Sequence, residues 1–357
     1  MFNRYVEKQR LLGKGEPSWH FSPGMGVVIP DRWIEGFVAD GNVQATCADG
    51  GVVLKESATG RWFARPDGYS ADEIPTAMLG AVCGDVAGSR FERRPTKKCL
   101  DVDSMIGSGS RFTDDTVMTC AVGAGICAAM SKLPSDPMSA DGYEEVFLTE
   151  IRDALKLYGN KYIHAGYGGT FFRWLRSSCA VKPYGSFGNG SAMRASFAGW
   201  AARSLEEAER LGELSAMVTH DHPEGIKGAV VTAGCIFLLR DGAGKEQVAE
   251  YAERHYNMDF TLDGIRPDYT FDVTCQGSVP QSIKAFLEGE SFVDVIAKAI
   301  SLGGDSDTMA AIAGSIAEVI YPIPEKLKRR VIERLDEFLC STLADAVDTV
   351  FGGRAVD

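Results

Sequence analysis

Apolar positions follow two different spacings along this chain, and the change falls near residue 73. Before it, short alternating apolar stretches broken by Gly and Pro are typical of β-strands. These stretches are 26–29, 33–38, 52–54 and 61–64. After it, Ala-rich segments repeat apolar residues with the 3.6-residue period of amphipathic helices. The pattern predicts an all-α main domain over 74–357 and a small, partly β N-terminal extension over 1–73.

The helical period sets the predicted elements of the main domain. The predicted helices are 74–90, 113–131, 142–158, 191–202, 205–218, 224–240, 245–256, 279–288, 291–302, 307–320 and 324–350. The less regular segment 257–275, which contains Pro267, predicts a surface loop near the functional site. In the last helix an apolar residue recurs every four positions, which predicts one face packed on the core. These residues are Leu327, Val331, Leu335, Leu339 and Leu343.

Composition narrows the classes of function. The 357 residues suit one large domain with an appendage, and the net charge of −12 argues against nucleic acid as the main partner. No uninterrupted apolar run reaches the length of a membrane span, and the first residues lack the apolar stretch of a signal peptide. Nine cysteines without a Cys-x-x-Cys pair suit a reducing compartment. We therefore expect a cytoplasmic protein without a membrane partner.

Two short acidic clusters carry the strongest chemical signal. They are Thr113-Asp114-Asp115-Thr116 and Asp305-Ser306-Asp307-Thr308, and each opens an apolar, helix-like run. Capping of a helix by Thr113, with acidic residues in its first turn, would explain the first cluster alone. Adjacent carboxylates in an apolar segment are unfavourable unless cations neutralise them, and oxygen ligands suit Mg²⁺, Mn²⁺ or Ca²⁺. Two such clusters together indicate a two-metal site.

Glycine-rich segments accompany the clusters. Gly84 and Gly88, four apart on a predicted helix, permit close packing of a neighbouring backbone. Glu92 ends that segment and is either a general base for a metal-bound water or a solvated carboxylate. The segments 166–171 and 186–194 are Gly-rich turns that enter helices, a weak but typical pattern of phosphate binding.

The pair His220-x-His222 is a further candidate. No other histidine or cysteine pair lies nearby to complete a zinc site. We therefore interpret His220 as a hydrogen-bond donor to a ligand rather than as a metal ligand.

These segments, in this order, resemble the ADP-ribosylglycohydrolase family over about residues 74–325. The matching motifs are Gly84-Asp85…Gly88…Glu92, Thr113-Asp114-Asp115-Thr116, Tyr167-Gly168-Gly169, Gly188-Asn189-Gly190-Ser191-Ala192-Met193-Arg194, Thr219-His220 and Gly303-Gly304-Asp305-Ser306-Asp307-Thr308. The best-known bacterial members release ADP-ribose from a modified arginine of dinitrogenase reductase. The resemblance implies an all-α fold with a binuclear Mg²⁺ centre, Mn²⁺ being the alternative.

The resemblance also implies site residues. The implied metal ligands are Thr113, Asp114, Asp115, Asp305, Asp307 and Thr308. The implied substrate-binding residues are Gly168, Gly169, Asn189, Gly190, Met193 and His220. Catalytic roles fall to Glu92, Asp115 and Asp305, of which Glu92 meets the metal-bound water or the substrate ribose. The chain is thus expected to be a metal-dependent hydrolase that removes ADP-ribose from modified protein side chains, arginine first.

Two other interpretations stay open at this stage. Some relatives act as immunity proteins against ADP-ribosylating toxins, so one alternative is a binding protein that inhibits such a transferase directly by occluding its active site with the N-terminal extension. That extension holds interface-type aromatic residues, Trp19, Phe21, Trp33, Trp62 and Phe63, which equally suit a small flap packed on the main domain. A catalytically silent relative is the other alternative, against which the intact set of metal ligands argues.

Overall fold

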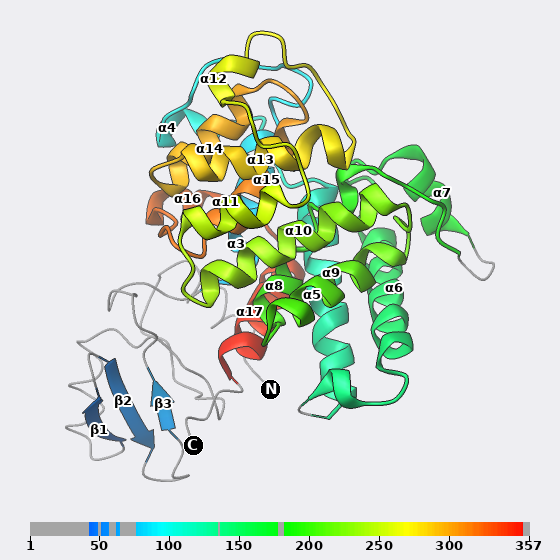
Figure 1. The fold of residues 1–357 in the computed structure, drawn as a ribbon, viewed down its shortest axis with the longest axis vertical. Coiled ribbons are helices and arrows are strands. Elements are labelled where there is room, and N and C mark those ends of the chain that lie inside the picture. The colour runs from blue at the N-terminus through cyan, green and yellow to red at the C-terminus, as the bar shows by residue number, and fades with distance from the viewer. Residues whose placement is uncertain are drawn as a thin grey trace.

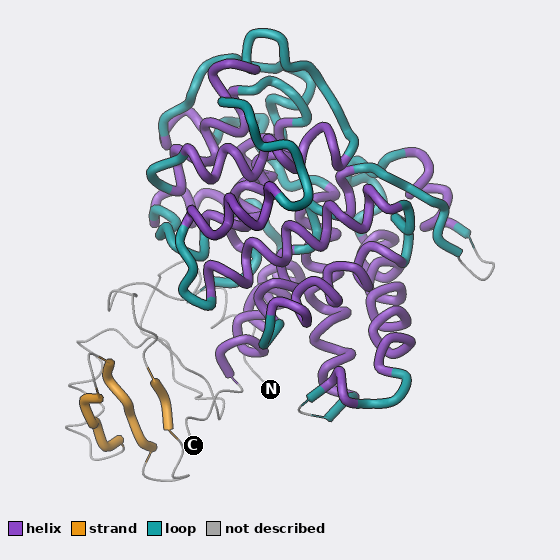
Figure 2. Tube along the Cα trace, in the orientation of Figure 1, coloured by secondary structure: helices purple, strands orange, loops and turns teal. Residues whose placement is uncertain are grey.

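The computed structural model describes residues 76–352 apart from 135 and 178–181, together with three short strands nearer the N-terminus. The strands β1 (Val43–Ala48), β2 (Gly51–Glu56) and β3 (Trp62–Ala64) form an antiparallel sheet in the order β1-β2-β3 (Figure 2). β2 and β3 coincide with two of the predicted strand stretches. The stretches 26–29 and 33–38 lie outside the described residues, as do the aromatic side chains of the extension, and the boundary near residue 73 stays a prediction.

The rest of the described chain consists of helices and the loops that join them, which confirms the all-α prediction (Figures 1 and 2). They are α3 (Leu79–Gly88), α4 (Val102–Met105), α5 (Asp114–Lys132), α6 (Tyr143–Lys161), α7 (Gly169–Arg176), α8 (Ser196–Ala201), α9 (Leu205–Met217), α10 (Pro223–Arg240), α11 (Lys245–Glu253), α12 (Leu262–Ile265), α13 (Cys275–Glu288), α14 (Phe292–Ser301), α15 (Ser306–Ala317), α16 (Glu325–Ile332) and α17 (Glu337–Gly352). Between residues 76 and 352, the described β structure is a single bridge between Gly188 and Thr274.

Helices α3 and α15 pack along one another at the centre of the fold, and all their residues are buried (Figure 1). Glycine makes this approach feasible. A Cβ atom built on Gly84 would lie 2.0 Å from the carbonyl oxygen of Ala310, and one on Gly88 would lie 2.4 Å from that of Ser306. The predicted close packing at these two glycines is confirmed. It places the end of α3 beside the start of α15.

The start of α5 lies at the same place. Thr113 is its N-cap, as predicted, and its hydroxyl accepts a hydrogen bond from the backbone N–H of Asp115. The hydroxyl of Thr308, in the first turn of α15, donates to Oδ2 of Asp115 across 3.3 Å. The two acidic clusters therefore meet where two helices begin.

The prediction of one continuous C-terminal helix over 324–350 is wrong. The chain forms α16 and α17 with a turn at 333–336 between them. Asp336 explains the break, because its side chain accepts a hydrogen bond from the N–H of Leu339 and so caps α17. Arg334, in the turn, donates to the carbonyl oxygens of Ser110 and Gly107. The packed apolar face is confirmed, since all five predicted residues of the stripe are buried.

Two other predicted segments differ from the structure. The helix predicted over 191–202 is a 3₁₀ turn at Asn189–Ser191 followed by the shorter α8. For α7 the sequence predicts only that the Gly-rich segment 166–171 enters a helix, without giving the bounds of that helix. The predicted loop 257–275 holds one short helix, α12, and its residues Phe271 and Val273 line the pocket described below.

Two further features concern the cysteines and the length and polarity of the helices. The seven cysteines whose side chains the structure describes are all free thiols. None of the helices there is both long enough and apolar enough to cross a lipid bilayer.

Candidate functional site

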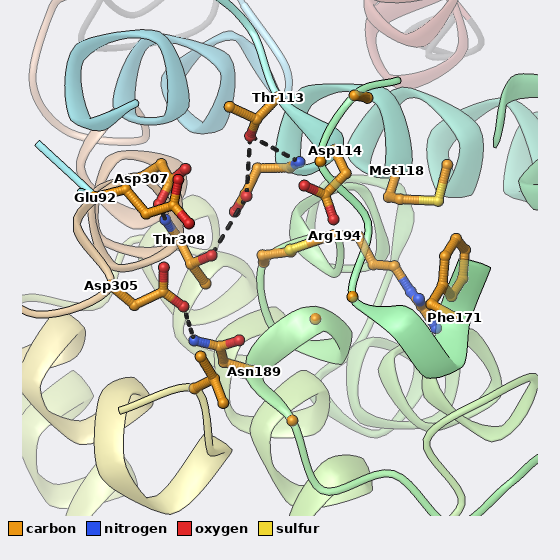
Figure 3. Close-up of a pocket in the computed structure, with 18 of the residues that line it drawn as sticks. Glu92, Thr113, Asp114, Met118, Phe171, Asn189, Arg194, Asp305, Asp307 and Thr308 are labelled. Atoms are coloured by element: carbon orange, nitrogen blue, oxygen red, sulfur yellow. Dashed lines mark hydrogen bonds between the residues drawn. The ribbon is translucent and has the colours of Figure 1, made fainter. Parts of the chain in front are cut away.

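A cavity of about 460 Å³ opens where α5 and α15 begin. Its lining includes every residue predicted for the site, although those residues come from six separate stretches of sequence. They are Glu92, Thr113, Asp114, Asp115, Gly168, Gly169, Asn189, Gly190, Met193, His220, Asp305, Asp307 and Thr308. Figure 3 shows the acidic side chains gathered on one side of the cavity, with Arg194 and Phe171 on the other.

Carboxylates crowd the acidic side of the cavity. Asp115 and Asp307 are buried, and together with Asp85 they place one oxygen each within 4.8 Å of one another. Oδ2 of Asp115 accepts from the hydroxyl of Thr308 at 3.3 Å and lies 3.3 Å from the hydroxyl oxygen of Thr113, whereas its Oδ1 is buried without a hydrogen-bond partner among the described residues. A buried carboxylate oxygen without a partner is costly unless a cation binds it.

Asp85 is a member of this cluster that the sequence analysis did not assign. Its Oδ1 accepts from the hydroxyl of Thr113 at 2.7 Å. Its Oδ2 accepts from the backbone N–H groups of Thr113 and Thr116 and from the Thr116 hydroxyl. With both oxygens occupied by donors, Asp85 anchors the first turn of α5 to α3 and so positions Asp114 and Asp115.

Burial and mutual repulsion raise the pKa values of the cluster. Burial raises the pKa of Asp115 and of Asp307 well above the ordinary value, and each is raised further by the neighbouring negative charges, first Asp307 for Asp115 and Asp305 for Asp307. Burial and then the charge of Asp85 raise the pKa of Asp114 to about 7. The positive ends of the α5 and α15 dipoles favour the ionised forms but do not offset this burial. In the metal-free protein these carboxyl groups therefore keep their protons to higher pH than exposed carboxyl groups do.

The donor set fits hard divalent cations. It consists of carboxylate and hydroxyl oxygens, and no side chain among the described residues forms an ion pair with Asp114, Asp115, Asp305 or Asp307. The unpartnered Oδ1 of Asp115 supplies a free lone-pair site at the centre of the cluster. This acidic group is able to hold a metal ion.

Asp305 and Glu92 complete the acidic side. Oδ2 of Asp305 accepts a hydrogen bond of 2.8 Å from the side-chain amide of Asn189, which fixes one carboxylate oxygen. Burial raises the pKa of Asp305, although the Asn189 hydrogen bond opposes the shift. Glu92 is half-buried and lies on the same side of the cavity as Asp307 and Asp305 (Figure 3). Like Asp114, it is half-buried, whereas Asp115, Asp305 and Asp307 are buried, so it can reach a molecule that enters.

Glycine-rich backbone and His220 form the opposite side. Gly168, the N-cap of α7, and Gly169 have open space where a Cβ would stand. A Cβ on Gly190 would lie 3.3 Å from Nε2 of His220, so the imidazole faces the glycine loop. His222, its partner in the His-x-His pair, instead caps α10 by accepting from the N–H of Glu224. The zinc interpretation therefore receives no support from the described residues.

Of the aromatic and basic side chains in the lining, Phe271 lies in the segment predicted to be a loop near the site, whereas no individual role was predicted for Phe171 or Arg194. Phe171 stacks on Trp174 with ring centroids 5.3 Å apart, and Phe271 is exposed at the pocket lining. Arg194 is almost fully buried beside His220. It stood within a quoted motif, but only the fold shows that it is buried.

The fold and the cavity together define a helical protein with an acidic, metal-capable end and a glycine-lined end in one pocket. A sequence model of the family described as ADP-ribosylglycohydrolase matches residues 69–356. The chain belongs to the ADP-ribosylglycohydrolase family and is a hydrolase of the glycosidic bonds of ADP-ribose.

Individual relatives are similar but distant. The chain is 26% identical over 320 residues to the ADP-ribosylhydrolase ARH3 of Danio rerio, covering 69% of this chain and 82% of that protein. It is 24% identical to the ADP-ribosyl-[dinitrogen reductase] glycohydrolase of Rhodospirillum rubrum, covering 75% and 96%. It is also 24% identical to the ADP-ribosylarginine hydrolase Tri1 of Pseudomonas putida, covering 71% of each chain.

One solved structure agrees in fold. It is titled ADP-ribosylglycohydrolase-related protein complex, and it matches with a TM-score of 0.50 and 22% identity over 78% of this chain and 96% of its own. At this identity the likeness concerns the fold alone.

Proposed function

We propose that this chain removes ADP-ribose from modified protein side chains in a metal-dependent reaction, with ADP-ribosylated arginine as the first substrate to test. The observation that carries the proposal is the cavity itself, where a carboxylate cluster faces glycine loops and a buried histidine. Two of the similar proteins bear names that specify ADP-ribosylarginine or an ADP-ribosylated protein, which supports this class of substrate.

The metal ligands of the proposal are Thr113, Asp114, Asp115, Asp305, Asp307 and Thr308, with two Mg²⁺ ions and Mn²⁺ as the alternative. Bound divalent cations supply Lewis-acid polarisation of water and of ribose hydroxyls. The Thr113 hydroxyl donates its proton to Asp85 and accepts from the backbone N–H of Asp115, which leaves one lone pair of its oxygen for a cation. The N-terminal ends of two helices set the ligand positions before any ligand binds.

Glu92 is the proposed general base. Water attacks C1″ of the ribose as the bond from C1″ to the side-chain nitrogen breaks, and Glu92 accepts the proton of that water. The guanidine leaves with the bonding electron pair and takes up the proton that Glu92 accepted, so the products are ADP-ribose and unmodified arginine. The glycine segments at 168–169 and 188–190 hold the ribose and the diphosphate, together with Met193 and His220.

The deciding experiment is release of free ADP-ribose from an arginine-ADP-ribosylated protein with Mg²⁺, with Mn²⁺ and with EDTA. Release that requires the divalent cation supports the proposal. No release from the folded protein in any of the three conditions would contradict arginine as the substrate linkage, and a serine-linked substrate would be assayed next in the same way.

Immunity to an ADP-ribosylating toxin, whether by hydrolysis or by direct binding of the transferase through residues 1–73, stays a prediction. Deleting residues 1–70 separates hydrolysis from direct binding of the transferase. Hydrolysis is expected to persist in the truncated chain, whereas binding to a transferase is expected to weaken.

A further inference from the structure

Arg194 is a buried cation without a carboxylate partner. Its side chain is 1% exposed, it lines the cavity, and no carboxylate among the described residues forms an ion pair with it. Nη2 donates to the carbonyl oxygen of Ser215 at 3.1 Å and to the hydroxyl of Thr219 at 2.7 Å, while Nε has no hydrogen-bond partner within the described part of the chain. Burial lowers the pKa of Arg194 to about 10, so the guanidinium remains charged at neutral pH. An uncompensated buried charge is expensive, which points to a function.

The hydroxyl of Thr219 connects this charge to His220. Its oxygen is 2.7 Å from Nδ1 of His220, and the same hydroxyl also interacts with the side chain of Tyr184. Because a guanidinium only donates, the Thr219 oxygen accepts from Arg194 and its proton is free to point to Nδ1. With the lone pair on Nδ1, the negative end of the imidazole dipole also points toward the Arg194 guanidinium, which is the favourable orientation.

The other ring nitrogen then carries the proton. Nε2 of His220 faces the loop at Gly188 and Gly190, where built Cβ atoms would lie 3.7 and 3.3 Å away. It has no hydrogen-bond partner among the described residues. Burial, and then the charge of Arg194, lower the pKa of His220 well below its usual range, so the ring is neutral.

The remaining titratable groups around the ring add no charge that would reverse this. Tyr184 hydrogen-bonds through its side chain with Thr219, and its ring centroid lies 6.1 Å from that of His220. Burial raises the pKa of Tyr184, so its phenol keeps its proton and can donate it to the Thr219 oxygen. Burial raises the pKa of Cys275, which approaches Ser191 of the same loop, to about 11. Asp221 is exposed, and its Oδ1 accepts from the N–H of Gly185.

We propose that Arg194 is a positioning residue that, through the Thr219 hydroxyl, holds His220 as the neutral tautomer protonated on Nε2 and presents that N–H to an anionic oxygen of the ligand at the 188–190 loop. The unpaired charge of Arg194 polarises this donor and favours an anion there. Identifying the anion as the diphosphate of ADP-ribose rests on the proposed function. The tautomer itself does not.

Long-range ¹H–¹⁵N NMR of the full chain with Mg²⁺ and without nucleotide reads the tautomer directly. The His220 signals are assigned by their loss in His220→Gln. The proton is expected on Nε2 in the wild type and in Thr219→Ser, which keeps the hydroxyl. In Thr219→Val, which removes it at nearly the same volume, a mixture of tautomers or a rise in the His220 pKa is expected. The matched control is Thr232→Val, which removes another buried hydroxyl, one that donates to Gly228.

Affinity for ADP-ribose, measured by calorimetry, completes the test. About tenfold weaker binding is expected for Thr219→Val, corresponding to about 1.4 kcal/mol, and little change for Thr219→Ser and Thr232→Val. A proton on Nδ1 in the wild type, or an unchanged tautomer and pKa in folded Thr219→Val, would overturn the proposal. Absence of ADP-ribose binding by the wild type would contradict the proposed function instead, because the tautomer is read without nucleotide.

Discussion

The side-chain amide of Asn189 donates a hydrogen bond of 2.8 Å to Oδ2 of Asp305, across 116 positions of sequence. This contact joins the glycine-rich loop at one side of the cavity to the acidic cluster at the other. Both residues are buried, so the bond fixes the orientation of a carboxylate that is a proposed metal ligand.

We therefore expect Asn189→Ala to lower both Mg²⁺ affinity and turnover by about 10- to 100-fold, the usual effect of removing a residue that orients a metal ligand. Turnover is followed by release of ADP-ribose at several Mg²⁺ concentrations. The exposed Asn160→Ala variant is the matched control. If Asn189→Ala needs no more Mg²⁺ than the wild type, the Asn189–Asp305 bond does not orient a ligand.

Removal of a carboxylate tests the ligand assignment itself. Asp114→Ala and Asp305→Ala should each abolish measurable turnover, because each deletes a proposed metal ligand. The fold should persist in both, since the change also removes a repelling charge from a crowded cluster. Turnover and far-UV circular dichroism are measured together, with the exposed Asp259→Ala as control. Retained activity in both site variants would contradict the metal assignment.

Much of the fold and the site could be predicted because local signals coincide there with tertiary structure. Thr113 is a typical N-cap followed by acidic residues, and the helix begins where that pattern places it. Gly84 and Gly88 lie on one helix face, and the close packing that they permit occurs. The break at residue 336 was not predicted, because the stripe of apolar residues every four positions favoured one continuous helix, and the cap that Asp336 provides to α17 is seen in the structure.

Other features depend on contacts that leave no local signal. The four hydrogen bonds that Asp85 accepts join α3 to the start of α5, and nothing in the neighbouring sequence specifies them. The same holds for Arg194, whose lack of a carboxylate partner is a property of the folded surroundings. Residues that position the site were therefore harder to predict than residues that line it.

The packing of α3 on α15 predicts a sharp contrast between two Gly→Ala changes. Gly84→Ala would place a Cβ 2.0 Å from a backbone oxygen of Ala310, a clash that side-chain movement cannot relieve. We expect it to lower the free energy of unfolding by about 3 kcal/mol or more. Gly169→Ala, in the first turn of α7 with open space around it, should change stability by less than about 1 kcal/mol. Urea denaturation of both variants measures the difference. Similar stabilities would show that α3 and α15 are not packed this closely.

Protons and metal ions should compete at the acidic cluster. Because burial and Asp85 raise the pKa of Asp114 to about 7 in the metal-free protein, a proton must leave before a cation binds there at lower pH. The rise in melting temperature on adding Mg²⁺ should therefore be smaller at about pH 6 than at about pH 8. Differential scanning fluorimetry measures it, with an EDTA sample at each pH as the reference. An equal rise at both pH values would be inconsistent with protonated carboxylates in the metal-free site.

Another buried carboxylate, that of Glu318 at the end of α15, contacts the start of α3 away from the cavity. Its Oε2 accepts from the N–H of Gly80 at 2.8 Å and from the hydroxyl of Thr76 at 3.0 Å. Burial raises its pKa from 4.5 to about 7, although these hydrogen bonds oppose the shift. The folded state therefore binds this proton more tightly than the unfolded state does. The resulting stabilisation is complete below about pH 4.5 and is lost as pH rises through about 7.

Over that range the wild type should lose roughly 3 kcal/mol more stability than Glu318→Gln, because the shift spans between two and three pKa units at about 1.4 kcal/mol each. Urea denaturation between about pH 5 and pH 8 in EDTA measures the difference. The metal-site carboxylates also make the free energy of unfolding fall as pH rises, and they do so equally in the wild type and in Glu318→Gln. Subtracting one pH curve from the other therefore isolates the contribution of Glu318. The exposed Glu253→Gln is the matched control and should parallel the wild type. Parallel curves for Glu318→Gln would mean that this carboxyl group is ionised in the folded protein at all these pH values, and that the N–H of Gly80 and the hydroxyl of Thr76 outweigh its burial.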